Sequence, residues 1–162
     1  MGSRLRRWLM NPVTTLRGAD IQPGQTVLEV GCGTGFFTLP AAKLIGDEGC
    51  LVAMDALSDF IEQVSKKVKS ADLKNVRVVK RDALNTGLGN ETIDTALLFG
   101  VLPWPVLPLN RLLPEMHRVL KPEGRLAVWL FPVSGWVPTS ILQSGLFTYV
   151  RKRNGVYNYR RC

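Results

Sequence analysis

Short runs of β-branched and apolar residues alternate along this chain with longer stretches in which apolar positions recur every three or four residues. The short runs have the length and composition of buried parallel strands, and the longer stretches have the period of helices. This alternation predicts an α/β protein with a doubly wound, mostly parallel sheet. The five predicted strands span residues 26–30, 50–54, 76–80, 93–99 and 126–131.

Helices are predicted at 36–45, 57–69 and 109–120, with a shorter helical piece around 138–144. Apolar residues at 57, 60, 61, 64 and 68 share one helical face, and the lysines at 66, 67 and 69 are expected to form a solvated outer face. Pro40 falls early enough in its helix to be tolerated. Residues 84–90 are predicted to form a loop, because they contain two glycines and leave little room for a helix.

The two ends of the chain have their own patterns. Residues 3–17 mix arginines with apolar residues and predict a short helix followed by a turn at Asn11-Pro12. Residues 146–160 form two β-rich runs joined by Asn154-Gly155, which is a strong hairpin signal. We expect one domain over residues 1–162, with a core at 26–131 and a short connection and closing hairpin at 132–162.

Three glycines, Gly31, Gly33 and Gly35, follow the first strand at spacings of two residues. Such a strand, tight turn and helix lets a ligand approach bare backbone closely. Phe36 stands where a dinucleotide fingerprint has a small residue, and no Gly-Lys-Ser/Thr follows to bind phosphate. The carboxylate of Glu29 would repel phosphates and favour a cationic ligand.

The sequence V-L-E-V-G-C-G-T-G at 27–35 resembles the first motif of class I S-adenosylmethionine (SAM)-dependent methyltransferases. The similarity is greatest to the ubiquinone/menaquinone C-methyltransferase-like (methyltransferase type 11) branch. Residues 118–124 resemble the family's R-V-L-K-P-G-G turn, with Glu123 in place of the first glycine; we expect little consequence from this change. The resemblance implies a Rossmann-like, seven-stranded sheet in the order 3-2-1-4-5-7-6, closed by an antiparallel hairpin strand. The apolar face within residues 1–20 could simply pack against the domain, and the resemblance favours a partial flap over the site.

The resemblance assigns SAM as the methyl donor and S-adenosylhomocysteine as its product. It places Glu29 near the donor's cationic methionine end, the glycine backbone along the methionine moiety, and Asp82 at the exocyclic amine of adenine. Asp55 ends the second strand, twenty residues after Gly35, where a doubly wound sheet binds ribose hydroxyls. An alternative is that Asp55 only caps the next helix. The candidate donor-binding residues are Glu29, Gly31, Cys32, Gly33, Gly35, Asp55, Ala56, Asp82, Ala83 and Phe99.

Methyl transfer from a sulfonium is an in-line displacement that depends largely on positioning, so no catalytic side chain is assigned. His117, the one histidine, is expected to be structural, and no cluster with metal-ligand spacing occurs in the sequence. The expected acceptor wall, formed by Trp8, residues 101–107 and residues 132–142 with Trp136, is apolar and aromatic. It favours a small apolar acceptor such as a quinone or a prenylated ring.

Charge leaves other functions open. The net charge is +8, and the excess lies at the ends: residues 1–17 hold four arginines and residues 124–162 hold six cations, with no acid in either segment. These ends either are simply solvated or attract an anionic membrane surface, a nucleic acid or an acidic substrate. Two alternatives to the small-molecule enzyme are therefore an RNA or protein methyltransferase, with tyrosines of the hairpin stacking on bases, and a SAM-binding module without turnover.

Chain length and cysteine usage limit the size of the protein and its cellular compartment. The 162 residues suffice for one domain but leave no room for a large substrate domain. Three cysteines, an odd number without metal-ligand spacing, indicate a reduced intracellular protein. No apolar stretch reaches the length of about 18 residues that a transmembrane helix needs. A cytoplasmic protein is expected, with peripheral membrane contact left open; the sequence does not predict an oligomeric state.

Overall fold

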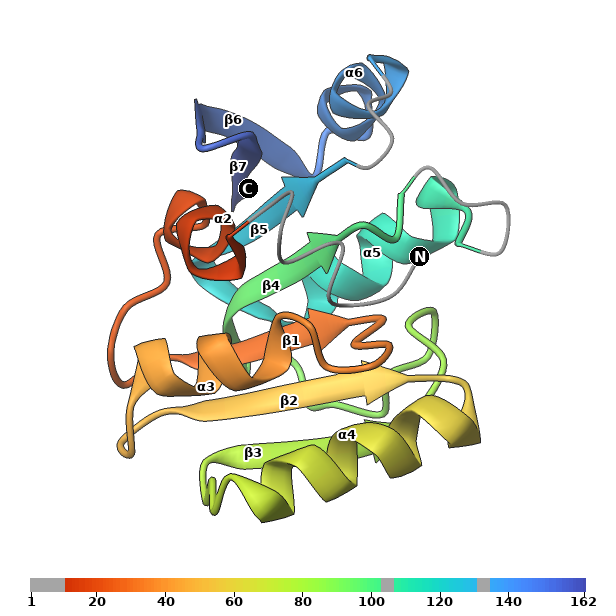
Figure 1. Cartoon of the computed structure of the whole chain (residues 1–162). Helices are drawn as coiled ribbons and strands as arrows, with labels where there is room; N and C mark the ends of the chain where they lie inside the picture. Colours follow the sequence, from red (N-terminus) through yellow and green to blue (C-terminus); the bar gives the residue numbers. More distant parts are fainter. Residues whose placement is uncertain (1–10, 103–106, 131–134) are drawn as a thin grey trace.

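The computed structural model describes residues 11–102, 107–130 and 135–162, and its centre is a single seven-stranded sheet in the order β3-β2-β1-β4-β5-β7-β6 (Figure 1). The first five strands are parallel, and β7 pairs antiparallel with both β5 and β6. The expected strand order and the closing hairpin are therefore confirmed. The strands are β1 (Thr26–Val30), β2 (Cys50–Asp55), β3 (Val76–Lys80), β4 (Ile93–Phe99), β5 (Leu120–Trp129), β6 (Phe147–Arg153) and β7 (Val156–Arg161).

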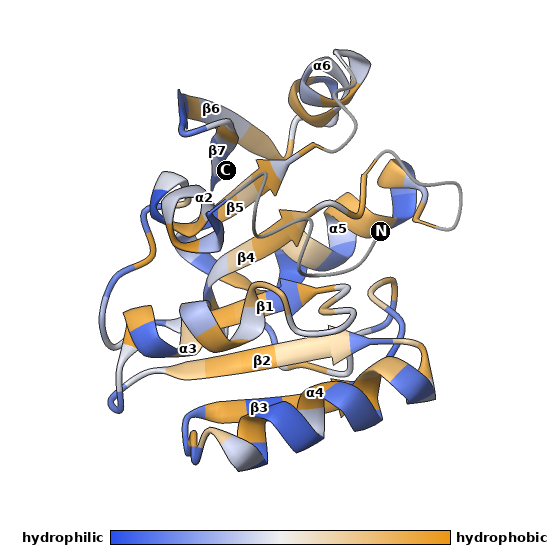
Figure 2. Ribbon diagram, in the orientation of Figure 1, coloured by the Kyte–Doolittle hydropathy of each residue, from blue (hydrophilic) through white to orange (hydrophobic). Residues whose placement is uncertain are grey.

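Helices cover both faces of the sheet. Alternate residues of β1 point to opposite faces: Val27 packs with the core under α2 and α3, whereas Leu28 and Val30 pack with the core under α5 and α6. Figure 2 shows the strands largely hydrophobic and the outer side of α4 hydrophilic, as the periodicity predicts. The helices are α2 (Pro12–Gly18), α3 (Thr38–Ile45), α4 (Ser58–Ser70), α5 (Leu109–Val119) and α6 (Trp136–Gln143).

Two helices begin later than the sequence predicts. Phe36 and Phe37 belong to the glycine turn, so α3 starts at Thr38; Pro40 then lies in the first turn, where its missing N–H costs no hydrogen bond. Leu57 precedes α4 with an extended backbone and is 58% exposed, so it is not part of the buried helical face. The loop at 84–90 contains no helix, as expected.

Strand β5 begins six residues earlier than predicted. Leu120 pairs with Ile93, and pairing resumes only at Arg125 opposite Thr95, so the intervening residues of β5 loop out of the ladder. Within this bulge Glu123 has a φ of 66°. A residue with a Cβ pays about 1 kcal/mol or more for this left-handed backbone, which explains why a glycine suits the position.

Helix α2 begins where the sequence predicts a turn. The Asn11 side chain accepts a hydrogen bond from the Val13 amide (2.9 Å), and Pro12 occupies the first helical position. An asparagine cap followed by proline is a favourable helix start, so Asn11-Pro12 opens a helix rather than ending one. Residues 1–10, which include most of the helix and flap expected there, lie outside the described residues.

Helix α2 is bound to the hairpin at the other end of the chain. The Asn158 side-chain amide donates to the Gly18 carbonyl (2.8 Å), and that of Asn154 donates to the Thr14 carbonyl (2.9 Å). Asn154 and Gly155 both have positive φ, as a two-residue hairpin turn of the expected kind requires. The helix and the hairpin therefore fix each other on one face of the sheet.

Candidate functional site

The carboxyl ends of β1, β2 and β4 bring the predicted ligand-binding segments together. The glycine turn, residues 31–35, follows β1; Asp55 ends β2, the neighbour of β1 on one side; and Phe99 ends β4, its neighbour on the other side. The chain leaves β1 toward β2 and later returns to add β4 on the opposite side. Open α/β sheets bind ligands at such a switch point.

The glycine turn has one closed side and one open side. Gly31, Gly33 and Gly35 all have positive φ, at 69°, 55° and 89°. A Cβ on Gly31 would meet the Val101 side chain at 2.4 Å, so this glycine permits close packing of the segment after β4. Among the described residues, no atom lies within 4 Å of a Cβ built on Gly33. The Gly33 backbone is thus open to a ligand, which fits the role expected of this turn.

Asp55 connects the glycine turn to the start of α4. Its Oδ2 accepts a hydrogen bond from the Gly33 amide (3.1 Å), and its Oδ1 accepts one from the Leu57 amide (3.0 Å). The Asp55 side chain therefore bonds to the residue that precedes α4, and it also stabilises the glycine turn. A carboxylate offers about four lone-pair sites, so these two bonds leave acceptor capacity for ligand hydroxyls.

Glu29 is a buried carboxyl group beneath the turn. It is 3% exposed, and the Thr38 hydroxyl donates to its Oε1 (2.7 Å). Burial raises the pKa of Glu29 to about 7; the Thr38 hydrogen bond opposes this shift, and the negative charge of Asp55 adds to it. Two neighbouring carboxyl groups thus give this edge of the sheet a local preference for cations.

The lysines of α4 are exposed, as expected, and Lys67 also makes a contact that the sequence pattern did not predict. Its Nζ donates to the backbone carbonyl of Thr34, within the glycine turn. The lysine thereby attaches the turn to the outer helix. Sequence periodicity could not distinguish it from Lys66 and Lys69, because all three are exposed and only the packing of α4 beside the turn separates them.

Cys32 contributes to the turn through its backbone. Its amide donates to the Met54 carbonyl (2.9 Å). Burial, followed by the charges of Glu29 and Asp55, raises the pKa of the Cys32 thiol to about 12. The thiol is therefore neutral at physiological pH and unsuited to act as a nucleophile.

The other predicted residues divide into exposed and buried ones. Ala56 is exposed directly after Asp55, and Asp82 is exposed after β3, where its Oδ1 accepts from the Leu84 amide (2.9 Å). Ala83 is buried in the core. The Phe99 ring packs edge to face against Phe37, with centroids 5.1 Å apart. Phe99 thus uses its side chain for the α3-side core, so any ligand contact there would involve its backbone.

His117 has the contacts of a structural residue. Its Nε2 lies 3.0 Å from the Cys162 carbonyl oxygen, and its ring packs edge to face on Phe147. The Arg161 guanidinium donates to the His117 carbonyl (2.7 Å). These contacts join α5 to the closing hairpin, in agreement with the structural role expected.

The described segments lack two kinds of feature. Over residues 11–102, 107–130 and 135–162, no group of three or more His, Cys, Asp or Glu side chains is arranged to hold a metal ion. Within the same segments, no helix has both the length and the apolar character needed to cross a membrane.

Comparison with known proteins identifies the family. Residues 27–124 match the model of the methyltransferase domain family, and the chain belongs to this family. It is similar to the demethylmenaquinone methyltransferase of Listeria welshimeri, with 34% identity over 114 residues, covering 70% of this chain and 48% of that protein. A Bacillus cereus demethylmenaquinone methyltransferase is 32% identical over 113 residues, covering 69% and 47%. The chain thus spans about half the length of these relatives.

Solved structures support the same fold. A SAM-dependent methyltransferase from Aquifex aeolicus superposes with a TM-score of 0.76 at 23% identity, covering 99% of this chain and 98% of that one. A geranyl diphosphate C-methyltransferase from Streptomyces coelicolor superposes with a TM-score of 0.79 at 12% identity, covering 98% and 81%. The family resemblance inferred from the glycine motif is confirmed.

Proposed function

We propose that this chain binds SAM at the carboxyl edge of β1 and β2 and transfers its methyl group to a small, apolar, quinone-type acceptor. The observation that carries the proposal is the glycine turn, whose open Gly33 backbone lies beside two carboxyl groups. Glu29 and Asp55 together suit a cationic ligand and do not suit a dinucleotide's phosphates. The family membership and the demethylmenaquinone methyltransferase relatives support the same reaction class.

Each of the residues on this edge would bind a different part of SAM. The glycine turn and Glu29 would hold the methionine end, and Asp55 would accept hydrogen bonds from the ribose hydroxyls. Leu57 stands two residues after Asp55, and its 58% exposed side chain is unusual for a leucine. With Ala56, it offers an apolar surface against which the adenine ring can pack. Asp82 would accept from the adenine amine.

When bound, SAM supplies an electrophilic methyl group on a sulfonium sulfur. The chain's contribution is to orient the donor and to keep water from the methyl. The carboxylates of Glu29 and Asp55 attract the charged donor, and this attraction is lost for the neutral thioether of the product. They therefore favour exchange of product for fresh donor. Val101, packed on Gly31, brings the segment after β4 directly against the turn.

Contacts in the hairpin argue against RNA as the acceptor. Cations that could bind phosphates are already engaged with carboxylates of this chain, which lowers the gain from binding a polyanion. The segment 101–108, which follows β4 in the sequence, holds no charged residue and also favours an apolar acceptor; residues 103–106, with Trp104, lie outside the described residues. The ion pairs are Arg151 and Arg153 with Asp20, Arg160 with Glu123, and Arg161 with Glu91.

Calorimetry and labelled-methyl transfer test the proposal together. We expect SAM and S-adenosylhomocysteine to bind and NAD not to bind. Transfer of a labelled methyl group should be greater to a panel of quinone precursors than to total RNA. Binding of NAD, or no binding of SAM, would disprove the donor site. Labelling confined to RNA would reverse the choice of acceptor, and SAM binding without transfer to any acceptor would identify a binding module.

A further inference from the structure

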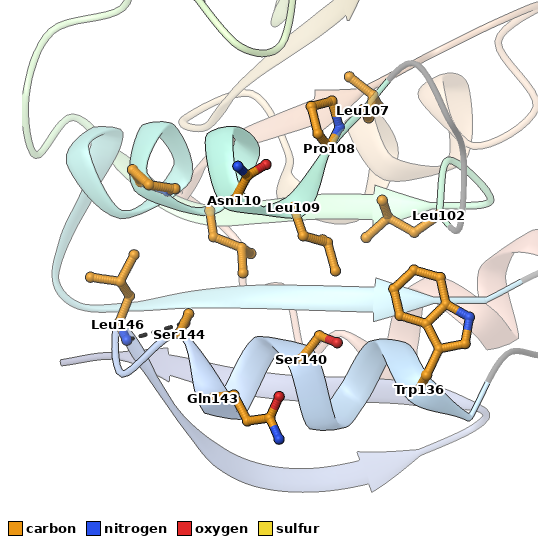
Figure 3. A pocket seen from close by; sticks show the side chains of 12 residues that line it. Leu102, Leu107, Pro108, Leu109, Asn110, Trp136, Ser140, Gln143, Ser144 and Leu146 are labelled. Carbon is orange, nitrogen blue, oxygen red and sulfur yellow. Dashed lines mark hydrogen bonds between the residues drawn. The ribbon is translucent and has the colours of Figure 1, made fainter.

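A hollow of about 600 Å³ lies between α5 and α6, on the face of the sheet opposite α3 (Figure 3). Its volume is within the range of small-molecule binding sites. One wall comes from α5, with Leu109 and Leu113, and the facing wall comes from α6, with Trp136 and Ser140. Leu102, after β4, lies at one end, and Leu146, before β6, lies at the other.

The hollow begins at the edge of the sheet that carries the candidate donor site. In Figure 3, Leu102 and Trp136 lie near the arrow tips of their neighbouring strands, which are the carboxyl ends, and Leu146 lies at the opposite end. Leu102 follows Val101, the residue that packs on Gly31. Val101 therefore contacts the glycine turn, and the next residue, Leu102, lines the hollow.

The described part of the lining is uncharged, although the chain has a net charge of +8. The described residues around the hollow are leucines, prolines and a tryptophan, with Asn110, Gln143 and two serines, and none of them ionises. Trp136 is 57% exposed, and an exposed tryptophan on a concave surface can gain free energy by covering itself with another apolar group. A phosphate-bearing ligand would find no cation among these described residues, whereas a hydrocarbon chain would bury apolar surface.

We propose that the hollow between α5 and α6 binds the hydrocarbon tail of the methyl acceptor. This inference rests on the proposed function, because it assumes that the acceptor's ring meets the donor methyl at the carboxyl edge. The tail then runs from Leu102 and Trp136 along α5 and α6 toward Leu146. A long apolar tail, rather than the ring alone, provides most of the acceptor's binding free energy.

Two variants on α6 provide a matched test. Ser140 faces the hollow and is half-buried, so Ser140→Phe fills the space that the tail would occupy. Thr139, the preceding residue, is exposed and does not line the hollow, so Thr139→Phe adds the same side chain outside it. Both variants should keep the wild-type melting temperature and SAM affinity, because neither residue touches the glycine turn.

The first measurement uses a tail without a reactive ring. Farnesol, an uncharged fifteen-carbon isoprenoid alcohol, is titrated into the protein and followed by calorimetry. We expect binding to the wild type and to Thr139→Phe, and binding at least roughly tenfold weaker to Ser140→Phe, since burying even two methylenes accounts for a factor of this size. No binding to the wild type, or equal binding to both variants, would overturn the inference.

The second measurement uses acceptors with one ring and tails of zero to four isoprene units. We expect KM to fall with each added unit in the wild type and to be independent of tail length in Ser140→Phe, with KM for the tail-free ring unchanged. A KM that ignores tail length in the wild type would overturn the inference. If SAM binds but no ring is methylated, the proposed function fails, and the farnesol titration still decides the tail site. Dimerisation abolished by Ser140→Phe would instead identify the hollow as an interface between copies and overturn it.

Discussion

At the scale of single residues, Glu29 suits ligand binding at the expense of the stability of the ligand-free protein. A carboxyl group buried beneath the turn has a pKa near 7, against an ordinary value of 4.5. Between these two values the folded chain holds a proton that the unfolded chain has released. The contribution of Glu29 to stability is therefore complete below pH 4.5 and is lost as the pH rises to about 7. Above that pH the ionised group suits a cationic ligand but weakens the ligand-free fold.

Glu29→Gln should therefore stabilise the ligand-free protein at pH 8 and not at pH 4.5. The expected gain in the free energy of unfolding is up to about 3 kcal/mol, the value of the pKa difference. Urea denaturation at several pH values measures it. At pH 8 the same variant should bind SAM more weakly while changing S-adenosylhomocysteine binding less, because only the donor carries the sulfonium charge. An unchanged pH profile of stability would refute this account.

Asp55→Ala should weaken SAM binding by about 1 to 3 kcal/mol, since it removes an acceptor from the Gly33 and Leu57 amides and from the ligand. Calorimetry at fixed pH measures the loss. Asp55→Asn is the matched control, because its amide oxygen retains one acceptor while the negative charge is removed. If Asp55→Ala lowers the melting temperature but leaves SAM affinity unchanged, Asp55 is a brace and cap only.

At the scale of elements, local pattern predicted the strands and most of the site, whereas packing decided the rest. β1 and the glycine turn are readable because the apolar run and the glycine spacing are contiguous in sequence. The early start of β5 is not, because Leu120 joins the sheet only through its partner Ile93. The bond from Lys67 to Thr34 and the hollow between α5 and α6 likewise depend on the placement of whole helices, about which periodicity gives no information.

Gly18→Ala tests the joint between α2 and the hairpin. A Cβ at Gly18 would lie 2.3 Å from the Arg153 carbonyl oxygen, which is backbone and cannot move without shifting the hairpin. We expect a loss of about 1 to 3 kcal/mol in unfolding free energy, although alanine is the better helix former. Gly135→Ala is the control, because no atom of the described residues lies within 4 Å of its Cβ position. Equal stability of the two variants in urea would contradict the claim that close packing at Gly18 attaches α2 to the hairpin.

At the scale of the whole molecule, the candidate donor site joins segments that follow three strands of the sheet. A ligand held by the glycine turn, by Asp55 and by Asp82 contacts the chain only when β1, β2 and β3 are in register. Binding there should therefore stabilise the entire domain rather than one loop. The unfolded chain, in which these segments separate, offers the ligand no comparable site.

SAM at one hundred times its dissociation constant should accordingly raise the free energy of unfolding by about 2.7 kcal/mol. Thermal denaturation with and without ligand measures the shift, and NAD at the same concentration serves as the negative control. In Asp55→Ala the shift at that fixed SAM concentration should shrink. Stabilisation by NAD equal to that by SAM would contradict a donor-specific site.

The position of β7 inside the sheet has a consequence for how the protein is made. β7 lies between β5 and β6 although it is the strand farthest along the chain. A chain synthesised from its N-terminus therefore exposes the unpaired edge of β5 until residues 156–161 emerge, and such an edge can pair with another chain. In the finished sheet the outer strand on this side is β6, where Arg151, Lys152 and Arg153 discourage pairing with another chain. The period of greatest aggregation risk thus falls during synthesis, before the hairpin closes.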